Sequence, residues 1–142
     1  MTDARRFRLF VYGTMLPGEV HASLLEGATA LGGARTAPKY HLVELGPSAA
    51  LLEGGLVSVV GELYEVSPQI LAACDLERQH PVLYLRKRVE LDDGGEAYAY
   101  FLRNEQTVGR RRIKSGDWKA RFKGDRPEAG AFVRWARDRH RR

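Results

Sequence analysis

The chain has 142 residues, of which 44% are hydrophobic and 29% are charged. That length suits one ordinary domain, and that balance favours a packed core over disorder. No apolar run approaches the roughly 18–20 residues that a membrane helix needs, and the apolar run near the N-terminus is too short for a secretory signal. We therefore expect one cytoplasmic domain over residues 1–142, with no membrane contact.

The net charge of +5 is unevenly distributed. Residues 109–142 hold 13 basic and four acidic side chains, a net charge of +9, whereas residues 1–108 hold 10 basic and 14 acidic, a net charge of −4. A basic segment can bind nucleic acid, but "GRRRIK" has no interleaved aromatic residues for stacking on bases. We therefore expect a solvated basic C-terminal segment from about residue 109, and nucleic-acid binding stays as the weaker alternative.

The single cysteine and the four histidines restrict metal chemistry. Cys74 has no second cysteine with which to form a disulfide or a CxxC motif. The histidines lack the close spacing of zinc ligands; they are His21, His41, His80 and His140. We therefore expect no metal site.

Hydrophobic periodicity and turn residues divide the chain into short elements. Strands are predicted over residues 6–12, 34–46, 55–66, 83–91 and 96–102. Helices are predicted over residues 19–27, 67–79 and about 127–139. The last two strands are expected to pair as a hairpin through "DDGG".

Local signals support two of these elements. Ser67 and Pro68 are typical of an N-cap and a first helical position. Gly61, inside the most β-prone strand, predicts a bulge or a sharp coil. Five or six strands with short helices, at irregular spacing, predict an α+β fold: a small mixed β-barrel with short flanking helices.

Four motifs appear in order along the chain: "VYGTML", "VVGELYEV", "ACDLERQHPVLYLRKRV" and "SGDW". As an ordered set, from residue 8 to about 118, they resemble the γ-glutamylcyclotransferase-like family, which includes AIG2-like proteins, γ-glutamylamine cyclotransferases and a butirosin biosynthesis enzyme. The resemblance implies a small mixed β-barrel. It also implies an intramolecular reaction without metal or cofactor: the α-amine of a γ-glutamyl group attacks its own γ-carbonyl, releasing 5-oxoproline and an amine. The implied partner is a γ-glutamyl-amine or γ-glutamyl-amino acid, and no feature of the sequence indicates an oligomeric state.

The resemblance implies that Glu77 is the general base, since it matches the glutamate at the end of the family's "LD-x-L-E" helix. A carboxylate there can accept a proton from the α-amine and return it to the leaving nitrogen. The sequence departs from the family pattern at Cys74, where an aspartate is usual, and Asp75 follows one place later. That shift leaves Asp75, Glu62 and Glu65 as competing carboxylates, and it leaves open the alternative of a non-catalytic module that binds a small ligand on the same fold.

The loop "YGTML" is implied to hold the acidic end of the substrate through backbone amides. Its residues are Tyr12, Gly13, Thr14, Met15 and Leu16. Gly13 permits a positive φ and a close approach of the main chain, and the N–H groups of Thr14, Met15 and Leu16 can form an anion-binding nest. An ordinary strand-to-helix turn, with Tyr12 filling the barrel, is the alternative.

Five further side chains complete the predicted site and its surroundings. Tyr84 and Tyr100 are secondary candidates for closing the pocket, and core packing is the alternative for both. Arg86 and Arg88 alternate with apolar neighbours and are expected to face solvent. The tryptophan of "SGDW" is expected to pack the C-terminal segment against the barrel.

Overall fold

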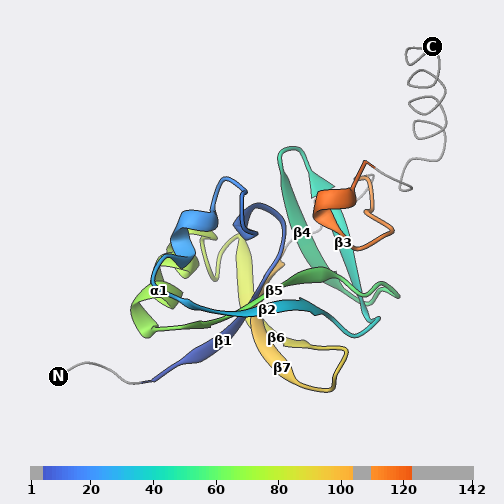
Figure 1. The fold of residues 1–142 in the computed structure, drawn as a ribbon. Coiled ribbons are helices and arrows are strands. Elements are labelled where there is room, and N and C mark those ends of the chain that lie inside the picture. The colour runs from blue at the N-terminus through green and yellow to red at the C-terminus, as the bar shows by residue number, and fades with distance from the viewer. Residues whose placement is uncertain (1–4, 104–109, 123–142) are drawn as a thin grey trace, which may run out of the picture.

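The computed structural model describes residues 5–103 and 110–122 and contains a mixed sheet of seven strands with one α-helix and three 3-10 turns (Figure 1). The strands are β1 (Phe7–Val11), β2 (Thr29–Arg35), β3 (Tyr40–Leu45), β4 (Ser48–Glu53), β5 (Val60–Val66), β6 (Tyr84–Glu90) and β7 (Glu96–Leu102). The helical elements are α1 (Pro68–Glu77), η1 (Gly13–Met15), η2 (Ala22–Leu25) and η3 (Trp118–Ala120). The predicted helix near residues 127–139 lies outside the described residues.

The α+β class and the mixed sheet are confirmed. The sheet runs in the order β2-β5-β1-β7-β4-β3, and β6 pairs with β7 from outside this path. Strand β7 runs parallel to both β1 and β4, whereas the other pairs are antiparallel. A bridge between Thr36 and Leu91 links the end of β2 to the end of β6, so the sheet curls toward a barrel without forming one closed ladder.

The strongest local signals gave the correct elements. The hairpin of β6 and β7 is continuous in register from Tyr84 opposite Leu102 to Glu90 opposite Glu96. In α1, the Ser67 hydroxyl accepts a hydrogen bond from the Ile70 N–H at 3.2 Å. That bond satisfies one of the donors that every helix leaves free at its N-terminus.

Several predicted boundaries were wrong. Residues 19–27 form the 3-10 turn η2 with flanking turns, not an α-helix. The predicted strand 34–46 covers the end of β2 and all of β3, with a break at Ala37–Lys39. Strands β2 and β4 were missed because "TALGGAR" is exposed and glycine-rich and "SAALLE" has the composition of a helix.

Gly61 has a different role from the one predicted. The register shift lies in the partner strand β2, between Ala30 and Gly32, whereas Gly61 pairs regularly with Ala34. A Cβ atom on Gly61 would lie 2.2 Å from the Val11 carbonyl oxygen and 2.5 Å from the Phe10 ring. Gly61 is therefore needed for close packing of β5 on β1.

The C-terminal part of the described chain packs on the sheet near the β3–β4 hairpin (Figure 1). Trp118 is 1% exposed, and its Nε1 donates to the Glu19 carboxylate at 3.1 Å. The Arg121 guanidinium lies 3.7 Å from the centre of the Trp118 ring. The predicted packing role of Trp118 is confirmed.

Candidate functional site

A pocket of about 480 Å³ opens where the ends of several elements meet. Its lining residues come from the start of η2, the β3–β4 turn, the end of α1, the start of β6, the end of β7 and the C-terminal segment: His21, Leu45, Gly46, Ser48, Glu77, Arg78, Leu83, Tyr84, Leu102 and Arg110. This size is within the usual range for small-molecule sites. The pocket brings together two predicted site residues, Glu77 and Tyr84, with several that the sequence did not single out.

Glu77 is the last residue of α1 and lies at the rim of this pocket. Its side chain is 43% exposed, and its Oε1 lies 3.8 Å from Nε2 of His21. The carboxylate is thus both accessible to solvent and directed toward a hollow. A general base needs that combination, because it must reach the substrate and exchange its proton.

A small hydrogen-bonded network lies next to Glu77. The hydroxyl oxygen of Thr14 lies 2.8 Å from Nδ1 of His21 and accepts a hydrogen bond from Nη2 of Arg78, also at 2.8 Å. Thr14 is 3% exposed, so the network anchors the pocket to the loop after β1. His21 and Arg78 therefore hold the end of α1 against that loop.

Most N–H groups of the predicted anion-binding nest donate hydrogen bonds within the β1 loop itself. Gly13 has φ of +63°, and a Cβ there would lie 3.0 Å from the Ala49 side chain, so both backbone conformation and space favour glycine. The Leu16 N–H donates to the Gly13 carbonyl at 3.1 Å, and the Met15 N–H donates to the Tyr12 carbonyl at 3.4 Å. Among the three predicted donors, the Thr14 N–H is the one that these turn bonds do not use. Met15 and Leu16 pack in the core.

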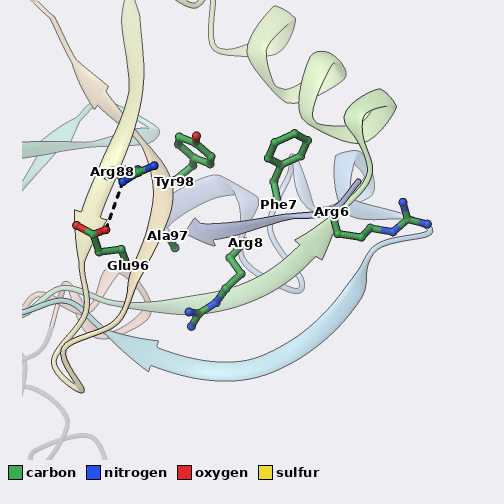
Figure 2. Close-up of a pocket in the computed structure, with 7 residues that line it drawn as sticks. All are labelled: Arg6, Phe7, Arg8, Arg88, Glu96, Ala97 and Tyr98. Carbon is green, nitrogen blue, oxygen red and sulfur yellow. Dashed lines mark ion pairs between the residues drawn. The ribbon is translucent and has the colours of Figure 1, made fainter. Parts of the chain in front are cut away.

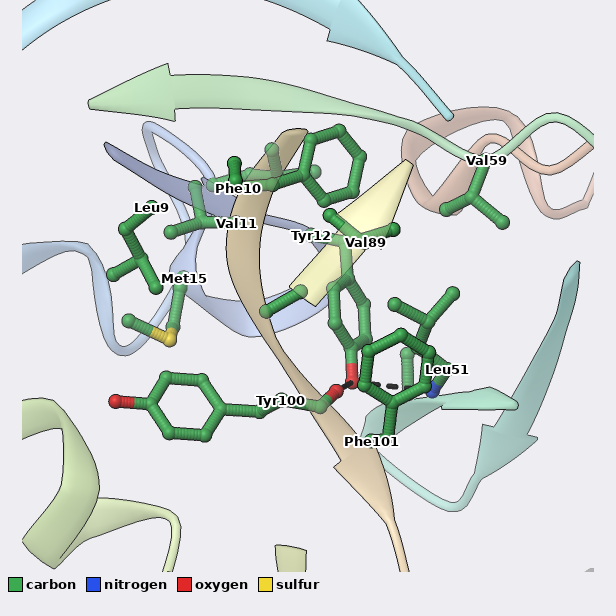
Figure 3. Close-up of a cluster of buried hydrophobic side chains, with 14 of the residues drawn as sticks. Leu9, Phe10, Val11, Tyr12, Met15, Leu51, Val59, Val89, Tyr100 and Phe101 are labelled. Atoms are coloured by element: carbon green, nitrogen blue, oxygen red, sulfur yellow. Dashed lines mark hydrogen bonds between the residues drawn. The ribbon is translucent and has the colours of Figure 1, made fainter. Parts of the chain in front are cut away.

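The hydroxyl of Tyr12 links three elements inside the core (Figure 3). It donates to the Tyr100 carbonyl at 2.6 Å and accepts from the Leu51 N–H at 3.1 Å. Burial raises the pKa of the Tyr12 hydroxyl. These contacts match the barrel-filling alternative for Tyr12.

Tyr84 lies in the pocket but is held firmly. Its hydroxyl donates to the Ala49 carbonyl at 3.0 Å, and the Arg78 guanidinium lies 5.4 Å from its ring centre. Burial raises the pKa of the Tyr84 hydroxyl, and the nearby Arg78 charge opposes that rise. The Tyr84 ring therefore forms one wall of the pocket, and the Arg78 guanidinium lies over its face.

The other carboxylates named from the sequence lie elsewhere. Asp75 accepts from the Tyr100 hydroxyl at 2.6 Å and from Nε of Arg86 at 2.8 Å. Arg86 was expected to face solvent, and that prediction was wrong because Asp75 draws its side chain against the sheet. Glu62 lines a separate hollow at β2 and β5, and Glu65 does not line the pocket. Glu77 is therefore the one carboxylate among the described residues that lines this pocket.

A second hollow lies at the other end of β1 (Figure 2). It has a volume of about 390 Å³ and is lined by Arg6, Phe7, Arg8, Arg88, Glu96, Ala97 and Tyr98. Its acidic group, Glu96, lies 3.6 Å from Arg88, as the dashed line in Figure 2 shows. Arg88 is 70% exposed, as expected from the sequence. The carboxylate of this hollow is paired with a guanidinium, whereas that of Glu77 lies 3.8 Å from a ring nitrogen of His21.

His21, Ser48, Arg78 and Arg110 were not identified as site residues from the sequence. No local pattern marks them, because their convergence depends on how the β1 loop, the β3–β4 turn and the end of α1 pack together. Arg78 carried one weak signal, its position directly after Glu77.

The described residues contain no cluster of three or more His, Cys, Asp or Glu side chains that could hold a metal ion. In the same part of the chain, no helix is long and apolar enough to cross a bilayer.

Comparison with known proteins defines the class to which this fold and pocket belong. The family model described as "Gamma-glutamyl cyclotransferase, AIG2-like" matches residues 9–120. The chain therefore belongs to the AIG2-like γ-glutamyl cyclotransferase family.

Individual relatives agree with this assignment. A protein from Vibrio cholerae, provisionally named a γ-glutamylcyclotransferase, is 37% identical over 110 residues, which cover 78% of this chain and 93% of the relative. A protein from Methanocaldococcus jannaschii with the same provisional name is 34% identical over 116 residues, covering 78% of this chain and 94% of the relative. The crystal structure of an AIG2-like protein from Mus musculus superposes with a TM-score of 0.63 at 26% identity, covering 73% of this chain and 83% of that one.

Proposed function

We propose that this protein is a γ-glutamyl cyclotransferase that converts a γ-glutamyl-amine or γ-glutamyl-amino acid into 5-oxoproline and a free amine. Family membership over residues 9–120 supports the reaction class. The single structural observation that carries the proposal is the position of Glu77, whose carboxylate lies at the rim of a pocket of about 480 Å³.

In the proposed reaction, Glu77 acts first as a base. A free α-amine has a pKa of about 7.7–8.0 and is largely protonated at neutral pH. The form that attacks is the neutral amine, which has already released its extra proton to solvent. Glu77 accepts a further proton from the attacking nitrogen as that nitrogen bonds to the γ-carbonyl carbon. The carbonyl π electrons move to oxygen, which gives a tetrahedral intermediate with an oxyanion.

In the second half of the reaction, Glu77 acts as an acid. The bond between the former carbonyl carbon and the leaving nitrogen breaks, and the C=O bond forms again. Glu77 returns its proton to the leaving nitrogen, so the protein ends in its starting state. Because nucleophile and electrophile belong to one molecule, the pocket mainly has to fold the glutamyl chain for ring closure, and such positioning can lower the barrier by several kcal/mol.

Neighbouring groups have roles in this scheme that follow from their contacts. His21, anchored to Thr14 at 2.8 Å, lies 3.8 Å from Glu77 and keeps the carboxylate on the pocket side of α1. The Thr14 N–H is the loop amide that the turn bonds leave for the developing oxyanion. Tyr84 supplies a rigid wall for the glutamyl methylene groups.

The experiment is a turnover assay on the purified chain with matched substrates. A panel of γ-glutamyl-amines and γ-glutamyl-amino acids is incubated with the protein, and 5-oxoproline is measured by chromatography. We expect release from γ-linked compounds with a free α-amine. We expect none from N-acetylated analogues, which lack the nucleophile. Thermal stabilisation by γ-glutamyl ligands without any 5-oxoproline would contradict catalysis and would leave a binding protein on the same fold.

A further inference from the structure

We propose that Arg78 is the receptor for the α-carboxylate of the γ-glutamyl group, so that substrate recognition depends on a guanidinium rather than on the loop amides alone. This inference rests on the proposed function and names a specificity-determining residue for it. It applies to any ligand with a free α-carboxylate next to an α-amine.

The first argument is that the guanidinium is already fixed in place. Its Nη2 donates to the Thr14 hydroxyl at 2.8 Å, and its central carbon, Cζ, lies 5.4 Å from the centre of the Tyr84 ring. Thr14 and Tyr84 are themselves buried, at 3% and 5% exposure. A cation held on two sides by rigid neighbours loses little freedom when it binds a ligand. The bond to Thr14 uses one of the five N–H donors of the guanidinium.

The second argument is charge. Among the described residues, no carboxylate lies within ion-pair distance of Arg78 or of Arg110, which also lines the pocket. Within the described part of the chain, the pocket lining therefore holds two guanidinium groups and one carboxylate, that of Glu77. An anionic ligand group would balance this excess, and a carboxylate matches the guanidinium fork in shape as well as in charge.

The third argument is the match between the ligand and two consecutive residues. In a γ-glutamyl compound, the α-amine and the α-carboxylate are attached to the same carbon atom. Glu77 and Arg78 are consecutive and both line the pocket at the end of α1. Binding of the carboxylate to Arg78 would therefore present the amine on the side of Glu77.

The loop amides are poorly placed to do this work alone. The Met15 and Leu16 N–H groups donate within their own turn, at 3.4 and 3.1 Å. Of the three predicted donors, this leaves the Thr14 N–H, and a single amide cannot replace a bidentate cation. In this arrangement Arg78 binds the α-carboxylate, and the Thr14 N–H is left to bind the oxyanion.

The test compares two ligands that differ only at the α-carboxylate. One is γ-glutamyl-ethylamide, and the other is the same compound with its α-carboxylate converted to a carboxamide. Binding is measured by calorimetry in a Glu77→Gln background, so that ligand is not consumed, with and without Arg78→Gln. Arg88→Gln removes the same charge from an exposed site outside the pocket and serves as the matched control.

We expect the Glu77→Gln protein to prefer the carboxylate by roughly 10- to 100-fold, the range for hydrogen bonds to charged groups. Arg78→Gln should abolish that preference, Arg78→Lys should restore part of it, and Arg88→Gln should leave it intact. Thermal unfolding of each variant checks that the fold persists.

The outcomes separate this proposal from the proposed function. If the wild-type protein releases 5-oxoproline but Arg78→Gln retains the full preference, the Arg78 assignment is wrong and the enzyme stands. If no 5-oxoproline forms but the preference disappears with Arg78, the carboxylate receptor stands and the cyclotransferase does not. Failure of both ligands to bind the Glu77→Gln protein would contradict the Arg78 assignment.

Discussion

The hydroxyl of Tyr12 offers a direct test of how the barrel is held together. Replacing Tyr12 by phenylalanine removes one oxygen atom and keeps the ring. In the intact protein that oxygen donates to the Tyr100 carbonyl at 2.6 Å and accepts from the Leu51 N–H at 3.1 Å (Figure 3). Both partners belong to strands that pair with each other through Leu51 and Phe101.

The expected loss follows from two unsatisfied backbone groups. Tyr12, Leu51 and Tyr100 are 7%, 0% and 2% exposed, so water cannot readily replace the lost hydroxyl. An unsatisfied buried donor or acceptor costs about 1–3 kcal/mol. Because the two groups share one site and can relax together, we expect Tyr12→Phe to lower the free energy of unfolding by about 2–4 kcal/mol.

Urea unfolding, followed by tryptophan fluorescence, measures this loss. Tyr98→Phe is the matched control, because no hydrogen bond of the Tyr98 hydroxyl occurs in the described part of the chain and its ring is partly exposed. We expect the control to change stability by less than about 0.5 kcal/mol. Equal effects of the two substitutions would refute the structural role of Tyr12 and would reopen its assignment to substrate binding.

Two further predictions concern the β1 loop and α1. Gly13→Ala should lower the free energy of unfolding by about 1–3 kcal/mol, because Gly13 has φ of +63° and the new methyl group would lie 3.0 Å from the Ala49 side chain; an unchanged urea midpoint would contradict this. Cys74 is fully buried, and burial raises the pKa of its thiol to about 11 from 9.0, so the thiol should react with a disulfide reagent at pH 8 only after unfolding. Between pH 9 and about 11 the Cys74 thiol keeps its proton in the folded protein but loses it in the unfolded chain. The free energy of unfolding therefore has its full value below pH 9 and falls as the pH rises through this window. Over that window, wild type should lose about 2–3 kcal/mol more than Cys74→Ala, and parallel pH profiles would be the contrary result.

The sequence predicted the parts of this fold that depend on local signals. Ser67 and Pro68 define the start of α1, and alternation with "DDGG" defines the β6–β7 hairpin. Strand β2 escaped prediction because it is exposed on nearly every residue and gains its order from pairing with β5. Pairing partners distant in sequence override local propensity in such strands.

The site was only partly predictable for the same reason. The position of Glu77 at the end of a helix follows from local signals, and the family resemblance supplied its role. The contacts of Arg78 with Thr14 and Tyr84 join three segments, and no spacing rule links them. Arg86 was misassigned because period-two alternation gives the face of a strand but not the carboxylate, here Asp75, that a helix places above that face.

The central claim is that the Glu77 carboxylate moves the proton in ring closure. The most direct measurement is the rate of 5-oxoproline release by wild type and by Glu77→Gln, at saturating substrate and with thermal unfolding as the check on folding. The amide cannot accept the proton, so kcat should fall by roughly 10²–10⁴-fold, the usual contribution of general acid–base catalysis. A folded Glu77→Gln protein that releases 5-oxoproline at the wild-type rate would contradict the account.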